Sequence, residues 1–293
     1  MISASLINGL MALTGVFLFI VFYSPIMRGI LQGRQKFKSL GVNMFVEAIV
    51  KLVLAVVFVY IGWSVFGALI GTLIGMGAAF AVSFFQLNWV FRAEEKKADA
   101  DNIYQYTGPA VVIMFVILLV YTLDVWIAKI VFPAEVAGVY AISSILAKII
   151  FFGSQPISKA MFPMSAEKKE VKDSERIFFN ALGFVGLIVV VSLIFFYFIP
   201  EFIVRIFKGE IIEASAQILF YLGIGTSLLS FANLILLYKL SLGKVKRYLY
   251  ILIPLVLEAF LLYYFSHNLV EFSFAFIASS AVFLWVSISL VGD

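Results

Sequence analysis

Ionisable side chains stand inside long apolar runs at several places in this 293-residue sequence. Glu47 and Lys51 lie four residues apart in one such run, and Asp124, Lys148 and Glu258 lie in others. A charge at the centre of a bilayer helix costs roughly 2.5–3.5 kcal/mol on insertion scales. Side chains four residues apart meet on one helical face, so Glu47 and Lys51 can offset part of each other's cost. We therefore expect these faces to point at protein or water rather than at lipid.

The two lysines are the best candidates for contacts to a phosphate, because an ammonium is a compact cation. Lys51 and Lys148 both fall near the middle of their apolar runs. The alternative for each is a structural pair, of Lys51 with Glu47 or of Lys148 with another helix. The sequence leaves both interpretations open.

The carboxylates and the remaining cations have alternatives of the same kind. Glu258 is a candidate sugar acceptor, a proton or ion coupling site, or a partner for Lys148. Asp124 is a candidate for ion coupling or for the substrate pathway, or else a buried partner of a basic group. Arg28 and Lys239 lie at helix ends, where long basic side chains extend to the interface by default; the alternative is a funnel that admits an anionic head group.

Composition excludes several classes of protein. The chain is 63% hydrophobic with a mean hydropathy of +1.10, and 13% of its residues are charged, against about a quarter in soluble domains. With no cysteine and a single histidine, His267, the sequence offers no disulfide, no Cys or His metal cluster and no Ser-His-Asp triad. We predict neither an enzyme nor a cofactor, and the net charge of +4 is not a nucleic-acid signature in a membrane protein.

Apolar runs of about 20 residues are long enough to cross a bilayer. They predict an all-α, polytopic membrane bundle with nine transmembrane helices, at 5–30, 43–62, 65–91, 107–131, 138–159, 178–199, 214–238, 248–265 and 271–291. Four alternate loops hold 15 of the 21 Lys and Arg residues. The positive-inside rule makes these loops cytoplasmic, which places Met1 outside and Asp293 in the cytoplasm of a multi-pass protein.

A charged linker, 92–107, divides the chain into a partial N-terminal lobe of three helices, 1–100, and a C-terminal lobe of six, 101–293. Gly33 with Glu47 and Gly243 with Glu258 form a weak internal repeat, in parallel orientation. Two lobes of six helices require three further helices before Met1, and an outside N-terminus points the same way. Glycines every four residues at Gly67, Gly71 and Gly75 predict a close-packing helix face.

Two stretches carry a resemblance to a known family. The run RGILQGRQKFKSLGVNMFVEAIVKLVLAVVFVYIGWSVFGALIGTLIG resembles the helix 4–6 region of polysaccharide biosynthesis flippases. These belong to the multidrug/oligosaccharidyl-lipid/polysaccharide exporter superfamily. The run TLDVWIAKIVFPAEVAGVYAISSILAKIIFF, followed by Met161-Phe162-Pro163, is similar to the start of that family's second lobe. The likeness covers nearly the whole chain, although family members have twelve to fourteen helices.

The resemblance implies a twelve-helix exporter fold and O-antigen-type transport of a lipid-linked oligosaccharide between leaflets of the cytoplasmic membrane. Membrane lipids and a coupling cation, a proton or sodium ion, would be the other partners. The substrate pathway is expected to include Lys51, Lys148, Glu47, Glu258, Asp124, Arg28 and Lys239. Two alternatives stay open: a cation-coupled exporter of small drugs from the same superfamily, and an inactive, N-terminally truncated remnant.

Overall fold

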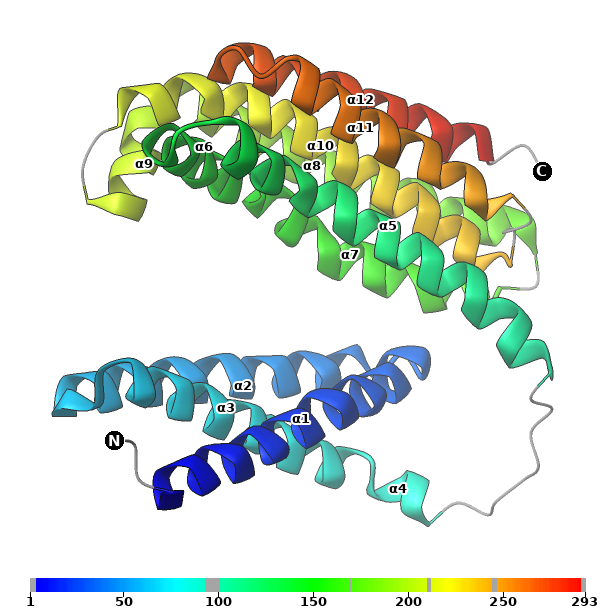
Figure 1. Cartoon of the computed structure of the whole chain (residues 1–293). Coiled ribbons are helices and arrows are strands. Elements are labelled where there is room, and N and C mark those ends of the chain that lie inside the picture. The colour runs from blue at the N-terminus through cyan, green and yellow to red at the C-terminus, as the bar shows by residue number, and fades with distance from the viewer. Residues whose placement is uncertain (1–3, 93–100, 169, 210–211, 244–246, 291–293) are drawn as a thin grey trace. The chain divides into compact units, whose positions relative to one another are not determined.

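The computed structural model describes residues 4–92, 101–168, 170–209, 212–243 and 247–290. All of the regular secondary structure in these ranges is helical, which confirms the predicted all-α class. The helices form two compact units, Met1–Lys97 and Ala98–Asp293, called unit 1 and unit 2 here (Figure 1). Half of the predicted linker 92–107, residues 93–100, lies outside the described residues, and the described chain resumes in a helix at Asp101.

Six helical segments among the described residues are long and apolar enough to cross a membrane, and two shorter apolar helices cover Phe17–Gly33 and Tyr248–Tyr264. One of the six, Phe37–Gln86, contains two helices joined by a kink. Each of the nine predicted spans therefore corresponds to a helical segment of the structure. A multi-pass membrane protein follows from their length and composition.

Unit 1 contains α1 (Ala4–Gly33), α2 (Phe37–Phe58), α3 (Ser64–Gln86) and the short α4 (Asn88–Phe91). A π-helical turn, Val59–Trp63, reverses the chain between α2 and α3. Gly62 adopts φ +100° at this turn, a conformation that is accessible to glycine because it lacks a Cβ atom. The turn makes α2 and α3 an antiparallel hairpin.

Glycines of α3 let the two helices of this hairpin touch. A Cβ atom built on Gly71 would lie 2.5 Å from the backbone nitrogen of Ala55, and one on Gly75 would lie 2.7 Å from the Lys51 backbone nitrogen. A Cβ on Gly67 would meet Phe58 at 2.8 Å. These distances leave no space for a side chain, so the predicted close-packing face is confirmed.

Two predicted loops are shorter than expected. The connection between the spans predicted at 5–30 and 43–62 shrinks to the three residues between Gly33 and Phe37, because α2 begins six residues before the predicted span. The connection between the spans predicted at 138–159 and 178–199 is helical over most of its length, as α7 continues to Ala166 and α8 begins at Val171. Both errors follow from charged helix ends, which extend beyond the apolar part of a membrane helix.

Unit 2 contains the remaining helices, which are α5 (Asp101–Val131), α6 (Ala134–Ala147), α7 (Ile149–Ala166), α8 (Val171–Phe198), α9 (Pro200–Lys208), α10 (Glu213–Ser241), the 3₁₀ turn η2 (Tyr248–Ile251), α11 (Leu252–Tyr264) and α12 (Leu269–Ser289). Helix α10 is the central element: it packs against α5, α6, α7, α8, α9 and α12 (Figure 1).

Small and hydroxyl side chains hold α10 to its neighbours. The Ser143 hydroxyl of α6 donates to the Ser215 carbonyl at 2.8 Å, and the Ser215 hydroxyl donates to the Val139 carbonyl at 2.9 Å. On another face, a Cβ on Gly225 would lie 2.5 Å from the ring of Phe276. Such close approach and interhelical hydrogen bonding replace the hydrophobic driving force that lipid cannot supply between helices.

Candidate functional site

A buried ion pair joins α5 to the end of α6 in unit 2. The Lys148 ammonium nitrogen lies 2.8 Å from Oδ1 of Asp124. The Ser144 and Tyr140 hydroxyls donate to Oδ2 of the same carboxylate, at 2.6 and 3.1 Å. Asp124 is fully buried and Lys148 is 6% exposed. Three donors thus satisfy the carboxylate, which reduces the cost of burying it.

The spacing along α6 explains how its three donors reach one carboxylate. Tyr140, Ser144 and Lys148 are each four residues apart, so they share one helical face. The helix direction continues from α6 into α7, because the Lys148 amide donates to the Ser144 carbonyl and the Phe152 amide to the Lys148 carbonyl, both at 3.0 Å. This continuous ladder presents the three donors to α5 as a row.

A second carboxylate lies beside this pair. Glu258 sits on α11, which packs against α5 and α12. It is 1% exposed, and neither carboxylate oxygen has a hydrogen-bond partner among the described residues. It interacts electrostatically with Asp124, Lys148 and Tyr140. Burying an unpaired charge is costly, so Glu258 is suited to taking up a proton or a cation. Three of the seven predicted site residues therefore come together in one cluster.

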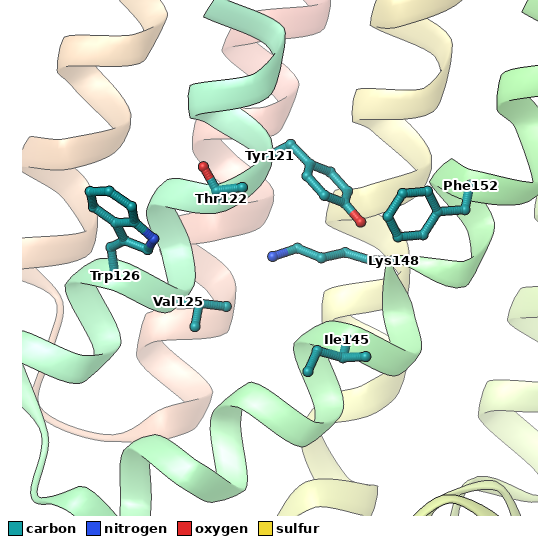
Figure 2. Close-up of a pocket in the computed structure, with 7 residues that line it drawn as sticks. All are labelled: Tyr121, Thr122, Val125, Trp126, Ile145, Lys148 and Phe152. Carbon is teal, nitrogen blue, oxygen red and sulfur yellow. The ribbon is translucent and has the colours of Figure 1, made fainter. Parts of the chain in front are cut away.

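Lys148 of this cluster lines a pocket of about 320 Å³ in unit 2 (Figure 2). The pocket is lined by Tyr121, Thr122, Val125 and Trp126 of α5 and by Ile145, Lys148 and Phe152 of α6 and α7. The Lys148 side chain crosses the pocket, and its nitrogen is directed toward α5 between Thr122 and Val125 (Figure 2). The same nitrogen lies 4.8 Å from the centroid of the Tyr121 ring, within the range of a cation–π contact.

Unit 1 holds a separate polar cluster at α1, α2 and α3. The Arg28 guanidinium forms an ion pair with Glu47 and donates to the Asn43 side-chain oxygen at 2.8 Å. The buried Asn43 amide in turn donates to the Ala79 carbonyl at 2.6 Å and to the Ser83 hydroxyl at 2.9 Å. From its position we expected Arg28 to extend to the interface. It packs within unit 1 instead.

Lys51 does not form the pair with Glu47 that was one of its two interpretations. The Glu47 carboxylate turns to Arg28 on α1, whose guanidinium donates to Glu47 through one terminal nitrogen and to Asn43 through Nε. Lys51 is half-buried and has neither an ion pair nor a hydrogen bond among the described residues. Its Cβ atom contacts Gly75 of α3, so the glycine face fixes where the side chain leaves the helix. An ammonium without a counterion is thus available in unit 1.

Lys239, the seventh predicted residue, lies in the last turn of α10. It is 3% exposed within unit 2. The expected extension to an aqueous interface is therefore wrong, since the side chain is enclosed by protein. Among the described residues, no three His, Asp or Glu side chains come together in a way that could hold a metal ion.

The sequence matches a family model described as "Polysaccharide biosynthesis protein" over residues 3–217. This chain belongs to the polysaccharide biosynthesis protein family. The predicted resemblance is confirmed by this match, which covers both unit 1 and much of unit 2. No curated protein sequence matches the chain significantly.

Solved structures place the fold of this chain among MATE transporters. A MATE protein in complex with MaD5 is 17% identical, with a TM-score of 0.76 over 94% of this chain and 67% of that chain. An outward-facing multidrug resistance MATE family transporter of the MOP superfamily is 18% identical, with a TM-score of 0.77 over 92% and 66%. The chain thus spans about two thirds of the length of these transporters, and similarity at this identity establishes the fold.

Several polar residues of both clusters were not singled out from the sequence of this polysaccharide biosynthesis protein. Tyr140 and Ser144 precede Lys148 at intervals of four, and Asn43 precedes Glu47 by four. The signal was therefore present as polar residues on the same helical face as a membrane charge. Ser83 lies on another helix from Asn43, and no local spacing links the two.

Proposed function

We propose that this polysaccharide biosynthesis protein is a flippase that moves lipid-pyrophosphate-linked oligosaccharides across the cytoplasmic membrane for surface polysaccharide biosynthesis. Its two helical units would act by alternating access, with the C-terminus in the cytoplasm. The observation that carries the proposal is a cluster of one ammonium and two carboxylates, from Lys148, Asp124 and Glu258, buried in a membrane bundle of this family.

The physical reason is the cost of such groups in lipid. Ionisable residues in membrane helices are expensive and mark ion or substrate paths by default. The head of a lipid-linked oligosaccharide combines an anionic pyrophosphate with neutral sugars, so a path for it needs both cations and hydrogen-bonding groups. Unit 1 offers the ammonium of Lys51, and unit 2 offers the hydrogen-bonded Asp124–Lys148 pair beside a pocket.

The predicted residues then take different roles. Lys51 is the phosphate contact, because its charge is uncompensated among the described residues of unit 1. Arg28 and Glu47 support the same path as a pair, and Lys239 contributes positive potential near the end of α10. Asp124 and Glu258 form the site for a coupling proton or sodium ion, with Lys148 as their shared counterion.

The test is complementation of a flippase-null cell with the protein carrying Lys51→Ala, Lys51→Arg or the parent residue. We expect Lys51→Ala to reduce surface polysaccharide and to leave lipid-linked oligosaccharide in the inner leaflet, while Lys51→Arg retains transport. Lys129→Ala, at an exposed position near the end of α5, is the matched control for loss of a lysine. Normal surface polysaccharide in Lys51→Ala cells at equal protein levels would remove the phosphate role, and failure of the parent protein would remove the flippase proposal.

A second candidate is a cation-coupled exporter of small cationic drugs. Glu258 favours it, because a buried carboxylate without a hydrogen-bond donor attracts a positively charged ligand. Efflux assays with a cationic dye separate the two functions: a drug exporter requires Glu258 and tolerates Lys51→Ala, whereas a flippase requires Lys51 and gives no dye efflux.

A further inference from the structure

We propose that the pocket beside Lys148 binds a neutral sugar ring of the lipid-linked oligosaccharide, while the pyrophosphate binds elsewhere. This inference rests on the proposed flippase function and adds which part of the substrate unit 2 recognises. Three features of the pocket support it: its charge, its aromatic walls and its unused hydrogen-bonding capacity.

Charge is the first reason. Lys148 is the only cation lining the pocket among the described residues, and its ammonium lies 2.8 Å from the Asp124 carboxylate. Glu258, a further acidic group, interacts with the same pair from α11. The local charge is therefore zero or negative, which repels a pyrophosphate in a medium of low dielectric constant. A neutral polar group meets no such penalty.

The walls are the second reason. Tyr121, Trp126 and Phe152 contribute aromatic rings to the pocket, and Trp126 is 69% exposed. An aromatic face carries a negative quadrupole, and the C–H groups on one face of a sugar ring are weakly positive. A volume of about 320 Å³ lies at the small end of ligand pockets, which span roughly 300–1,000 Å³. It suits one ring and not a whole oligosaccharide.

Hydrogen bonding is the third reason. The Lys148 ammonium has three N–H donors, and Asp124 accepts from it at one oxygen. The Thr122 hydroxyl donates to the Leu118 carbonyl at 2.9 Å, so its lone pairs remain as acceptors. The pocket thus offers a donor and an acceptor, and sugar hydroxyls use both. A hydrocarbon chain would leave the ammonium without a polar contact in the pocket, which is unfavourable.

The experiment measures binding of two kinds of synthetic lipid to the full chain in nanodiscs. One is polyprenyl pyrophosphate bearing a single N-acetylglucosamine or galactose, and the other is the same lipid without sugar. We expect Trp126→Ala to weaken binding of at least one sugar-bearing lipid by roughly five- to tenfold, the effect of one aromatic contact, and to leave the sugar-free lipid unchanged. Trp126→Phe should restore most of the affinity.

Trp285→Ala is the matched control, because Trp285 is equally exposed at 68% but lies on α12 outside the pocket. It should change the affinity for neither lipid. Lys51→Ala should weaken both lipids alike, since both carry the pyrophosphate. Equal loss of both lipids in Trp126→Ala, or no loss of either, would overturn the sugar pocket while leaving the flippase proposal intact. If the parent chain bound neither lipid, both proposals would fall.

Discussion

The Asp124–Lys148 and Arg28–Glu47 ion pairs differ in how completely they are buried. Asp124 and Lys148 are enclosed in unit 2, whereas the side chains of Arg28 and Glu47 are 24% and 18% exposed. Screening by solvent weakens the second pair, and removing one partner of a fully buried pair is far more costly than losing the pair as a whole. Stability at the residue scale should therefore depend most on Lys148.

Lys148→Met should destabilise the protein by about 3–5 kcal/mol, because it leaves the Asp124 carboxylate charged and buried without its counterion. The measurement is the midpoint of unfolding by SDS in mixed micelles, followed by helical circular dichroism. The double variant Asp124→Asn/Lys148→Met should recover more than half of the loss, since neither charge then remains. A double variant no more stable than Lys148→Met would contradict the ion-pair account.

The two carboxylates of the unit 2 cluster should respond differently to amide replacement. Asp124→Asn should cost at least ~2 kcal/mol, because the carboxylate accepts from Lys148, Ser144 and Tyr140. Glu258→Gln should stay within ~1 kcal/mol of the parent, because its oxygens accept no hydrogen bond among the described residues. The same SDS titration compares them, and equal losses would show that Glu258 has partners in the membrane-embedded protein.

At the scale of elements, the α2–α3 hairpin depends on backbone contact. Gly71→Ala should destabilise unit 1 by about 1–3 kcal/mol, because the new methyl group would lie 2.5 Å from the Ala55 backbone nitrogen and would push the helices apart. Crosslinking between cysteines introduced at Asn43 and Ser83 should fall in parallel, since these residues are in contact across the hairpin.

Gly41→Ala is the control within the same hairpin. A Cβ atom at Gly41 meets no atom within 4 Å, and alanine is favoured over glycine in a helix by about 0.5–1 kcal/mol. This variant should therefore be as stable as the parent or more so. Equal destabilisation by Gly41→Ala and Gly71→Ala would indicate a general intolerance of α2 and α3 to substitution.

The elements themselves could be predicted from apolar length, whereas their polar contacts could not. Nine apolar runs gave nine helical segments, and the glycine spacing on α3 indicated its packing face. The pair of Glu47 with Lys51, one of the two interpretations that the sequence left open, does not form, because the four-residue rule considers one helix alone and Arg28 of α1 binds the carboxylate. Asp124, Lys148 and Glu258 come together only because α5 packs against α6 and α11. Spacing within one helix cannot predict which helices pack together.

At the scale of the whole molecule, the predicted orientation can be tested because the chain contains no cysteine. A single cysteine can be introduced by Lys38→Cys at the start of α2, or by Tyr60→Cys at the π-helical turn, where Tyr60 is 91% exposed. By the positive-inside rule, a membrane-impermeant maleimide should label position 38 only from the cytoplasmic side and position 60 only from the outside. The reverse pattern would invert the topology.

The Asp124–Lys148 contact also bears on how the protein is made. The two residues lie on consecutive helical segments, α5 and the junction of α6 with α7, and each charge alone would cost roughly 2.5–3.5 kcal/mol at the bilayer centre. If α5 entered the lipid before α6 had emerged from the ribosome, the unpaired Asp124 charge would incur this free-energy cost. We therefore expect the translocon to retain the first segment until the second arrives, so that the two partition into the membrane as a hairpin.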